Sequence, residues 1–331
     1  MVVFGDSLSD GGNLNNLLSS LFPEQMAQQA TGWDPDYYYQ YRFSNGPIWV
    51  DFLYTSLGFA DVGSMGTNDG VNHMSGTNFA WAGSRSGTGS YGPVPIFPNL
   101  LTQIGNYSRQ LDEGNPALPD PATTLFTIWS GANDVFASVE KDDPITPTQV
   151  ASNLTTAITT LYAEGGRAFL VPNLPPIGLI PSYLDDLVKG PKATAFVDSY
   201  NLLLDTALDT LSADLDDITI IKVDIHGLFL AIMANPADYG FTNVTDTAYI
   251  RYGEEPYELR DPPYGELVPD SESYFYWDAA HGTTAANALI AQAAYQAVVP
   301  EPSTWFYLLL AGLGALVCGR KPFFRISRSA T

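Results

Sequence analysis

The sequence has few of the residues on which several kinds of site depend. A single cysteine in 331 residues, Cys318, excludes an internal disulfide framework and any cysteine-based zinc site. The three histidines, His73, His226 and His281, are too few to favour a multi-histidine metal centre. Basic side chains number 14 against 36 acidic ones, and the net charge is −22. Because binding to phosphates needs a basic surface, this balance argues against nucleic acid as a partner.

Apolar residues, by contrast, are plentiful. Hydrophobic residues make up 45% of the chain and aromatic residues 13%, which is enough for one substantial core. Short apolar runs typical of buried parallel strands occur at 2–4, 125–129, 168–171 and 218–223. Helical patterns occur at 147–164, where Thr146 is the expected N-cap, and at 193–215 and 284–298. This alternation predicts a three-layer α/β fold with a central parallel sheet.

Two stretches lack such a pattern. Residues 63–100 are dense in glycine, serine and asparagine, which predicts loops over the edge of the sheet. Residues 240–275 are rich in tyrosine, proline and acidic residues, which predicts an insertion with little regular structure. Long loops in a compact domain are usually functional or mobile, so we expect these two stretches to shape any substrate pocket.

The chain opens on a short apolar run that ends in a serine. Residues 2–4 break at Gly5, and Asp6 and Ser7 follow on the expected turn. A strand end of this kind presents a hydroxyl at the edge of a sheet, where a substrate can reach it. A serine in this place is either a turn or N-cap residue or a nucleophile. The second interpretation requires a general base and an oxyanion stabiliser elsewhere in the chain.

The base in serine hydrolysis is nearly always a histidine held by a carboxylate. Asp278 and His281 are three residues apart, so on a turn that leads into a helix both side chains can lie on one face. One imidazole nitrogen can then bond the carboxylate and the other can face Ser7. His226 is expected to be a loop residue after a strand, and His73 lies in the glycine-rich stretch.

Two segments can supply donors to an oxyanion. Asn133 follows the expected strand at 125–129, so its side chain should lie in a loop at the carboxyl end of that strand. Gly83 lies in the glycine-rich stretch, where its backbone N–H can approach a substrate closely. Each of these segments, taken alone, also fits an ordinary turn.

Together, these motifs resemble those of the GDSL, or SGNH, hydrolase family. In chain order they are Gly5-Asp6-Ser7-Leu8, the segment from Asn78 to Gly83, Gly131-Ala132-Asn133-Asp134, and the segment from Asp278 to His281. Further segments resemble the lipase/acylhydrolase branch of that family, at 42–49, 173–178 and 200–204. The resemblance runs from residue 1 to about residue 298.

This resemblance implies a flavodoxin-like fold and a serine mechanism without cofactor or metal ion. It implies that Ser7 is the nucleophile, that His281 is the base and that Asp278 orients the histidine. Asp6 and Asp134 belong to two of the matching motifs, and the resemblance implies that they support the site. The absence of a Gly-x-Ser-x-Gly motif agrees with this fold rather than with the larger α/β-hydrolase fold.

The resemblance also implies an oxyanion hole made by the Ser7 N–H, the Gly83 N–H and the Asn133 side chain. The sequence departs from the family pattern at two places. Ala82 stands where the first glycine of a Gly-Gly pair is usual, and Gly282 follows the histidine where proline is common. Both residues are small, so we expect the backbone to keep its close approach and the mechanism to be retained.

The C-terminal end has a different composition. Residues 1–299 hold 35 acidic and 10 basic side chains, whereas the last twelve residues hold four basic side chains and no acidic one. Before them, residues 305–318 form an uninterrupted apolar run. As a helix this run rises about 21 Å, and neighbouring residues can extend it towards the roughly 30 Å of a bilayer core. The basic cluster favours a membrane segment with a cytoplasmic C-terminus over a buried helix.

The order of Pro300-Glu301-Pro302, apolar run and basic end resembles the PEP-CTERM sorting signal of exported bacterial proteins. This resemblance implies export, transient membrane anchoring and processing by an exosortase-type sorting enzyme, after which the domain lies at the cell surface or outside the cell. We therefore expect a hydrolase domain at 1–298 and a sorting and anchor segment at 299–328. No signal peptide precedes residue 2, so we expect one upstream of Met1.

Taken together, the sequence predicts an exported serine ester hydrolase of the GDSL lipase or esterase type, acting through an acyl-enzyme. The expected substrate is a lipid, a small ester or an acylated sugar. One alternative is a carbohydrate O-acetyl esterase that acts on exopolysaccharide. Another is a non-catalytic surface or matrix binding protein on the same scaffold.

Overall fold

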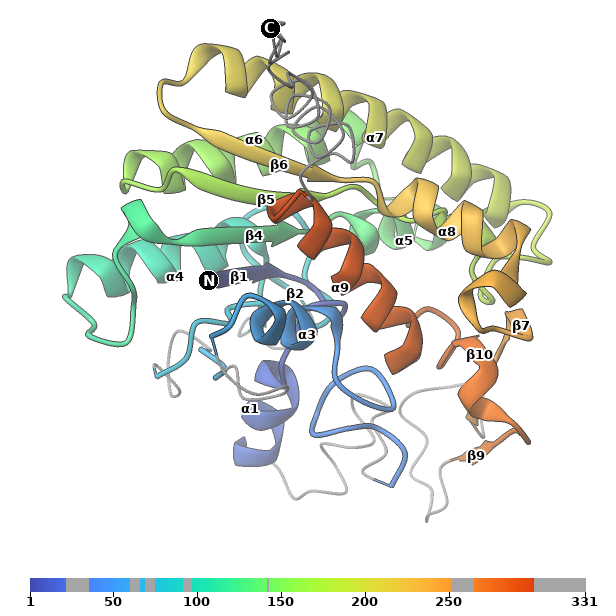
Figure 1. The fold of residues 1–331 in the computed structure, drawn as a ribbon. Coiled ribbons are helices and arrows are strands. Elements are labelled where there is room, and N and C mark those ends of the chain that lie inside the picture. Colours follow the sequence, from blue (N-terminus) through green and yellow to red (C-terminus); the bar gives the residue numbers. More distant parts are fainter. Residues whose placement is uncertain are drawn as a thin grey trace, which may run out of the picture. The chain divides into compact units, whose positions relative to one another are not determined.

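The computed structural model describes residues 1–21, 36–59, 66–68, 75–91, 97–141, 143–251 and 265–300 (Figure 1). The chain divides into two compact units, Met1–Val298 and Val299–Thr331. The expected C-terminal helix at 305–318 lies outside the described residues, as does His73. In the part of the chain that is described, no helix is long and apolar enough to cross a bilayer. The described helices and strands all lie in the first unit.

The centre of this unit is a parallel sheet in the order β1-β4-β5-β6. Its strands are β1 (Val2–Gly5), β4 (Leu125–Trp129), β5 (Ala168–Pro172) and β6 (Thr219–Val223). All three neighbouring pairs run parallel. The apolar runs thus mark these strands to within a residue at each end, and the predicted α/β fold with a parallel sheet is confirmed.

A fifth segment lies along the free edge of β1. Between residues 77–81 and β1 the backbone makes three hydrogen bonds, from Val3 N to Thr77 O at 2.9 Å, from Phe79 N to Val3 O at 2.7 Å and from Trp81 N to Gly5 O at 3.1 Å. With this segment the sheet has the flavodoxin-like order 2-1-3-4-5. The prediction that 63–100 consists of loops is therefore wrong at this point. The segment is short and lies in a stretch dense in glycine, serine and asparagine, so it does not stand out in the sequence.

Helices cover both faces of the sheet (Figure 1). On one face α4, α6 and α7 pack in sequence, with α5 against α7, and on the other face α3 packs against α9, with α8 beside it. The helices are α1 (Asn13–Leu21), α3 (Trp49–Ser56), α4 (Leu100–Asp112), α5 (Ala132–Glu140), α6 (Pro147–Ala163), α7 (Lys189–Asp214), α8 (Ile225–Ala234) and α9 (Thr284–Val298).

The ends of two helices show how local sequence sets them. Helix α6 begins as predicted, because the Thr146 hydroxyl accepts the N–H of Gln149 and Pro147 occupies the first turn. Helix α7 begins at Lys189, four residues before its predicted start. Pro191 lies in its first turn, where a missing N–H costs no intrahelical hydrogen bond.

Aromatic side chains form much of the core beside α4. Phe4 of β1, Phe126 of β4 and Phe169 of β5 follow one another across the sheet, with ring centroids 6.5 and 5.7 Å apart. Tyr107 of α4 meets Phe4 and Phe126 edge-on at 5.7 and 5.6 Å. All four side chains are fully buried. This packing holds β1, and with it the start of the candidate site, firmly in the sheet.

Further short strands pair in twos outside the main sheet. They are β2 (Ser90–Tyr91) with β3 (Phe97–Pro98), β7 (Asn243–Thr247) with β10 (Tyr274–Tyr276), and β8 (Tyr249–Arg251) with β9 (Gly265–Leu267). The prediction that 240–275 has little regular structure is therefore wrong. The strands within 240–275 are brief and pair with segments 14 to 31 residues away, so local patterns do not indicate them.

Candidate active site

The turn after β1 presents Ser7. Gly5 is required at its start, because a Cβ there would collide with the carbonyl oxygen of Trp129 on β4. After it, the Ser9 N–H donates to the Asp6 carbonyl at 3.0 Å, and the Leu8 N–H donates to Asp6 Oδ1 at 3.1 Å. These bonds close the turn and leave the Ser7 side chain half-buried at the carboxyl end of β1. This is next to the reversal of strand order between β1 and β4, where open α/β sheets bind their ligands.

The structure brings Ser7, His281 and Asp278 together. The Ser7 hydroxyl lies 2.8 Å from His281 Nε2, and His281 Nδ1 lies 2.9 Å from both carboxylate oxygens of Asp278. The backbone N–H groups of Ala280 and His281 donate to Asp278 Oδ1 at 3.0 and 2.8 Å. A carboxylate beside Nδ1 favours the tautomer with its proton there, which leaves Nε2 free to accept the proton of Ser7.

The charges of this pair reinforce each other. Burial lowers the pKa of His281, but the charge and hydrogen bond of Asp278 outweigh this effect, and the pKa of His281 is raised above the usual 6.5. Burial also opposes ionisation of Asp278, yet the imidazole and two backbone N–H groups hold the pKa of Asp278 below its usual value. The histidine is thus a stronger base than a free imidazole, beside a carboxylate that stays charged.

A segment near the N-terminus fixes the loop that carries the histidine. The Ser44 hydroxyl donates to the carbonyl of Gly282 at 3.0 Å, and Asn45 Oδ1 accepts the N–H of Thr284 at 2.8 Å. These contacts span about 240 positions, so the spacing of residues cannot indicate them. The only signal in the sequence was that 42–49 resembles a family motif.

The expected oxyanion donors lie on three segments, namely the turn after β1, the loop that contains Gly83 and the first turn of α5. Gly83 has φ of 77°, a left-handed conformation that favours glycine. Within the described ranges, the backbone N–H groups of Ser7 and Gly83 make no hydrogen bond. Asn133 Nδ2 donates to the carbonyl of Ser84 at 3.0 Å, which leaves its second hydrogen for another acceptor. The prediction of a loop is wrong for Asn133, because helix α5 begins directly after Gly131.

Ala82, one of the two residues that depart from the family pattern, is also held in place. The Ala82 N–H donates to Asp10 Oδ2 at 2.9 Å, and the other carboxylate oxygen of Asp10 accepts the N–H groups of Gly12 and Asn13 at 2.7 and 2.6 Å. Burial raises the pKa of Asp10 to about 6 despite these donors. The backbone before Gly83 is therefore anchored by a side chain, and the methyl group of Ala82 does not prevent this.

Two further buried carboxylates lie near the site. Burial raises the pKa of Asp6 to about 7, although the Leu8 N–H and the charge of His281 lower it. Burial likewise raises the pKa of Asp134 to about 6, and the Ser86 N–H donates to its Oδ2 at 2.8 Å. The described ranges contain no group of three His, Cys, Asp or Glu side chains able to hold a metal ion.

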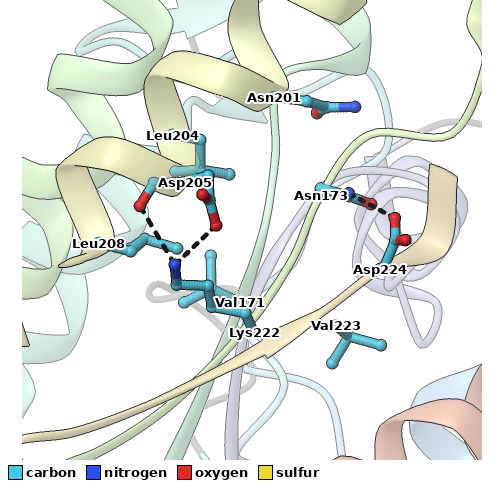
Figure 2. Close-up of a pocket in the computed structure, with 9 residues that line it drawn as sticks. All are labelled: Val171, Asn173, Asn201, Leu204, Asp205, Leu208, Lys222, Val223 and Asp224. Atoms are coloured by element: carbon cyan, nitrogen blue, oxygen red, sulfur yellow. Dashed lines mark hydrogen bonds and ion pairs between the residues drawn. The ribbon is translucent and has the colours of Figure 1, made fainter. Parts of the chain in front are cut away.

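His226 lies apart from Ser7, Asp278 and His281, in the helix that follows β6. It lies in the first turn of α8, not in a loop as predicted, and its Nδ1 is 3.3 Å from Asn201 Nδ2. Nearby is a pocket of about 320 Å³, lined by Val171, Asn173, Asn201, Leu204, Asp205, Leu208, Lys222, Val223 and Asp224 (Figure 2). Asn173 bonds Asp224 at 2.9 Å and Lys222 pairs with Asp205 at 2.6 Å. The first contact joins the ends of β5 and β6, and the second joins β6 to α7, so these polar groups already have partners.

The chain is similar to known proteins over most of its length. The family model described as GDSL-like lipase/acylhydrolase matches residues 1–294, and the PEP-CTERM protein-sorting motif matches residues 298–321. One GDSL esterase/lipase of Arabidopsis thaliana is 30% identical over 324 residues, covering 89% of this chain and 81% of the relative. Another is 28% identical over 319 residues, covering 89% and 86%.

Similarity to solved structures extends over most of the chain. A member of the lipolytic G-D-S-L family from Veillonella parvula has a TM-score of 0.41 at 16% identity, covering 91% of this chain and 97% of the other. An acetylxylan esterase from Geobacillus stearothermophilus has a TM-score of 0.42 at 11% identity, covering 89% and 91%.

Proposed function

The chain belongs to the GDSL-like lipase/acylhydrolase family, and we propose that it cleaves carboxylic esters with Ser7 as its nucleophile. The observation that carries the proposal is the chain of contacts from Ser7 Oγ to His281 Nε2 at 2.8 Å and from His281 Nδ1 to Asp278 at 2.9 Å. A serine, a histidine and a carboxylate in this arrangement can perform acyl transfer. The same contacts argue against a purely binding role on this scaffold.

In the proposed reaction, Ser7 Oγ attacks the ester carbonyl while His281 Nε2 takes its proton. Asp278 stabilises the imidazolium that forms. The tetrahedral intermediate collapses when His281 gives the proton to the leaving alcohol, and the acyl group remains on Ser7. Water, deprotonated by the same imidazole, then attacks the acyl-enzyme. The acyl–Oγ bond breaks, His281 returns the proton to Ser7 Oγ and the acid is released.

The negative oxygen of the intermediate needs donors that are already in place. In our proposal these are the N–H groups of Ser7 and Gly83 and the second hydrogen of Asn133 Nδ2. None of the three makes a hydrogen bond elsewhere among the described residues. Preorganised donors of this kind usually contribute the largest single part of the stabilisation of the transition state.

The C-terminal motif supports export of this enzyme. A PEP-CTERM motif covers residues 298–321, and export with processing at the C-terminus follows from it. We propose that residues 1–298 are the hydrolase domain and that residues 299–328 anchor it in the membrane until an exosortase-type enzyme cuts near Pro300. In this arrangement the hydrolase acts at the cell surface or outside the cell.

The proposed chemistry is common to lipids, small esters and acetylated sugars, because each presents the same ester carbonyl to Ser7. We propose a lipid or small ester as substrate, in keeping with the esterase/lipase relatives. A panel of p-nitrophenyl esters of increasing chain length, together with acetylated xylan, separates this proposal from a carbohydrate O-acetyl esterase.

The nucleophile is tested by Ser7→Ala in the full chain. We expect turnover of p-nitrophenyl esters to fall by about 10³-fold or more. A fluorophosphonate probe should label the native protein on Ser7 and leave the variant unlabelled, as shown by peptide mass spectrometry. Ser152→Ala, on the exposed side of α6, is the control and should match the native protein in both assays. Near-native turnover by Ser7→Ala would refute the proposal.

A further inference from the structure

Asp278 accepts a hydrogen bond from a residue that is not one of the three proposed catalytic residues. The hydroxyl of Tyr38 donates to Asp278 Oδ2 at 2.9 Å. Oδ1 is served by the N–H groups of Ala280 and His281, as described above. Among the described residues, each carboxylate oxygen therefore has its own donor in addition to the imidazole that both oxygens face.

The ring of Tyr38 is held so that its hydroxyl cannot turn away. Tyr249 and Trp277 meet it edge-on, with centroids 5.5 and 5.8 Å away, and only 7% of Tyr38 is exposed. Trp277 directly precedes Asp278, so the ring packs against the chain that presents the carboxylate. Burial and the nearby charge of Asp278 raise the pKa of Tyr38 well above its usual value. The hydroxyl therefore remains protonated, and remains a donor, throughout the working range of an esterase.

The backbone after Tyr38 is strained. Gln40 and Tyr41 have φ of 40° and 67°, a left-handed conformation that non-glycine residues adopt rarely. Two side chains hold this turn: Asn15 of α1 donates from Nδ2 to the carbonyl of Tyr41, and the adjacent Arg42 donates to that of Gln40, both at 3.0 Å. Strain that the surroundings maintain is concentrated at functional sites. This turn is the one that delivers Tyr38 to the carboxylate.

We infer that Tyr38 is a positioning residue for ester hydrolysis, acting through Asp278; this inference rests on the proposed function of Ser7 and His281. Rotation of the carboxylate about its terminal bond would break the bond from Tyr38. With Oδ2 held, Asp278 keeps the imidazole in the plane that directs Nε2 at Ser7. Tyr38 does not contact the reacting atoms, so substrate binding should not depend on it.

The inference is tested by Tyr38→Phe, which keeps the ring and removes the hydroxyl. We expect kcat for p-nitrophenyl acetate to fall on the order of 10-fold, as for the loss of one hydrogen bond to a charged group, with KM unchanged. Tyr276→Phe is the matched control, because the buried Tyr276 hydroxyl has no partner among the described residues. It should keep the native kcat. In an Asp278→Ala background, Tyr38→Phe should cause no further loss, because the group through which it acts is gone.

The outcomes separate this inference from the proposed function. If Ser7→Ala is inactive but Tyr38→Phe has the native kcat, the role of Tyr38 is wrong and that of Ser7 stands. An equal loss in the native and Asp278→Ala backgrounds, or a change confined to KM, would also overturn the inference. If Ser7→Ala keeps its activity, the proposed function itself fails.

Discussion

Gln103 holds both backbone groups of Gly5. The Gly5 N–H donates to Gln103 Oε1 at 3.0 Å, and Gln103 Nε2 donates to the Gly5 carbonyl at 2.9 Å. The same nitrogen lies 2.9 Å from the Ser84 hydroxyl. One side chain of α4 therefore connects the turn that carries Ser7 with the loop that carries Gly83.

The first prediction concerns this connection. Gln103→Leu should lower the free energy of unfolding by about 2–4 kcal/mol, because it leaves the buried N–H of Gly5 without its partner and removes a donor from the Gly5 carbonyl and from the Ser84 hydroxyl. Urea denaturation measures the change. The control is Gln149→Leu on the exposed start of α6, which should cost about 1 kcal/mol or less, since only a helix cap is weakened. A loss of similar size in both variants would contradict the role assigned to Gln103.

Asn133 is the subject of the second prediction. Asn133→Ala should lower kcat by about 10²–10³-fold, as for the removal of one oxyanion donor, and should change KM little. Steady-state kinetics with a chromogenic ester measures this. Asn153→Ala removes a comparable amide that bonds Ser86 at 2.9 Å and should keep nearly the native kcat. If the two variants lose activity equally, Asn133 serves the loop rather than the oxyanion.

A third prediction concerns His281, the proposed base. His281 must be neutral to accept a proton, so kcat/KM should fall as the pH falls through its pKa, which Asp278 raises above 6.5. Asp6 is the other carboxylate whose charge raises this pKa. Asp278→Asn removes the larger effect, so the acidic limb of the profile should move to lower pH while the maximal rate falls. If the acidic limb has the same midpoint in Asp278→Asn as in the native protein, His281 is not the group whose titration controls kcat/KM.

The fourth prediction concerns stability. The pKa of Asp6 is about 7 in the folded protein and about 3.8 when unfolded, so the folded state binds the proton more tightly. Ionisation of Asp6 therefore costs stability progressively as the pH rises from about 4 to 7. Asp6→Asn should be more stable than the native protein at pH 8, by up to a few kcal/mol, and this advantage should vanish near pH 4.

Urea midpoints at several pH values measure the difference. Asp186 provides a control of opposite sign, because the N–H groups of Lys189 and Val188 lower its pKa. Asp186→Asn should be less stable than the native protein at neutral pH, and the difference should fade as the pH falls below about 4. If the effect of Asp6→Asn on stability does not depend on pH, the raised pKa of Asp6 in the folded protein is wrong.

The elements that the sequence predicted are those with local causes. The apolar runs of the four main strands and the cap at Thr146 need only neighbouring residues, and each lies where expected. The spacing of Asp278 and His281 likewise allowed their contact on one turn. Segment 77–81 was missed because it is short and pairs with β1, which lies some 75 residues away.

Periodicity and short spacings encode the parallel α/β sheet, the serine turn and the Asp278–His281 pair, so these could be inferred from the residues alone. The contact of Ser7 with His281 across 274 positions, and those of Tyr38 with Asp278 and of Gln103 with Gly5, became evident only in the folded protein. Contacts between distant segments depend on how the sheet and its helices pack, and no local pattern of residues carries that information.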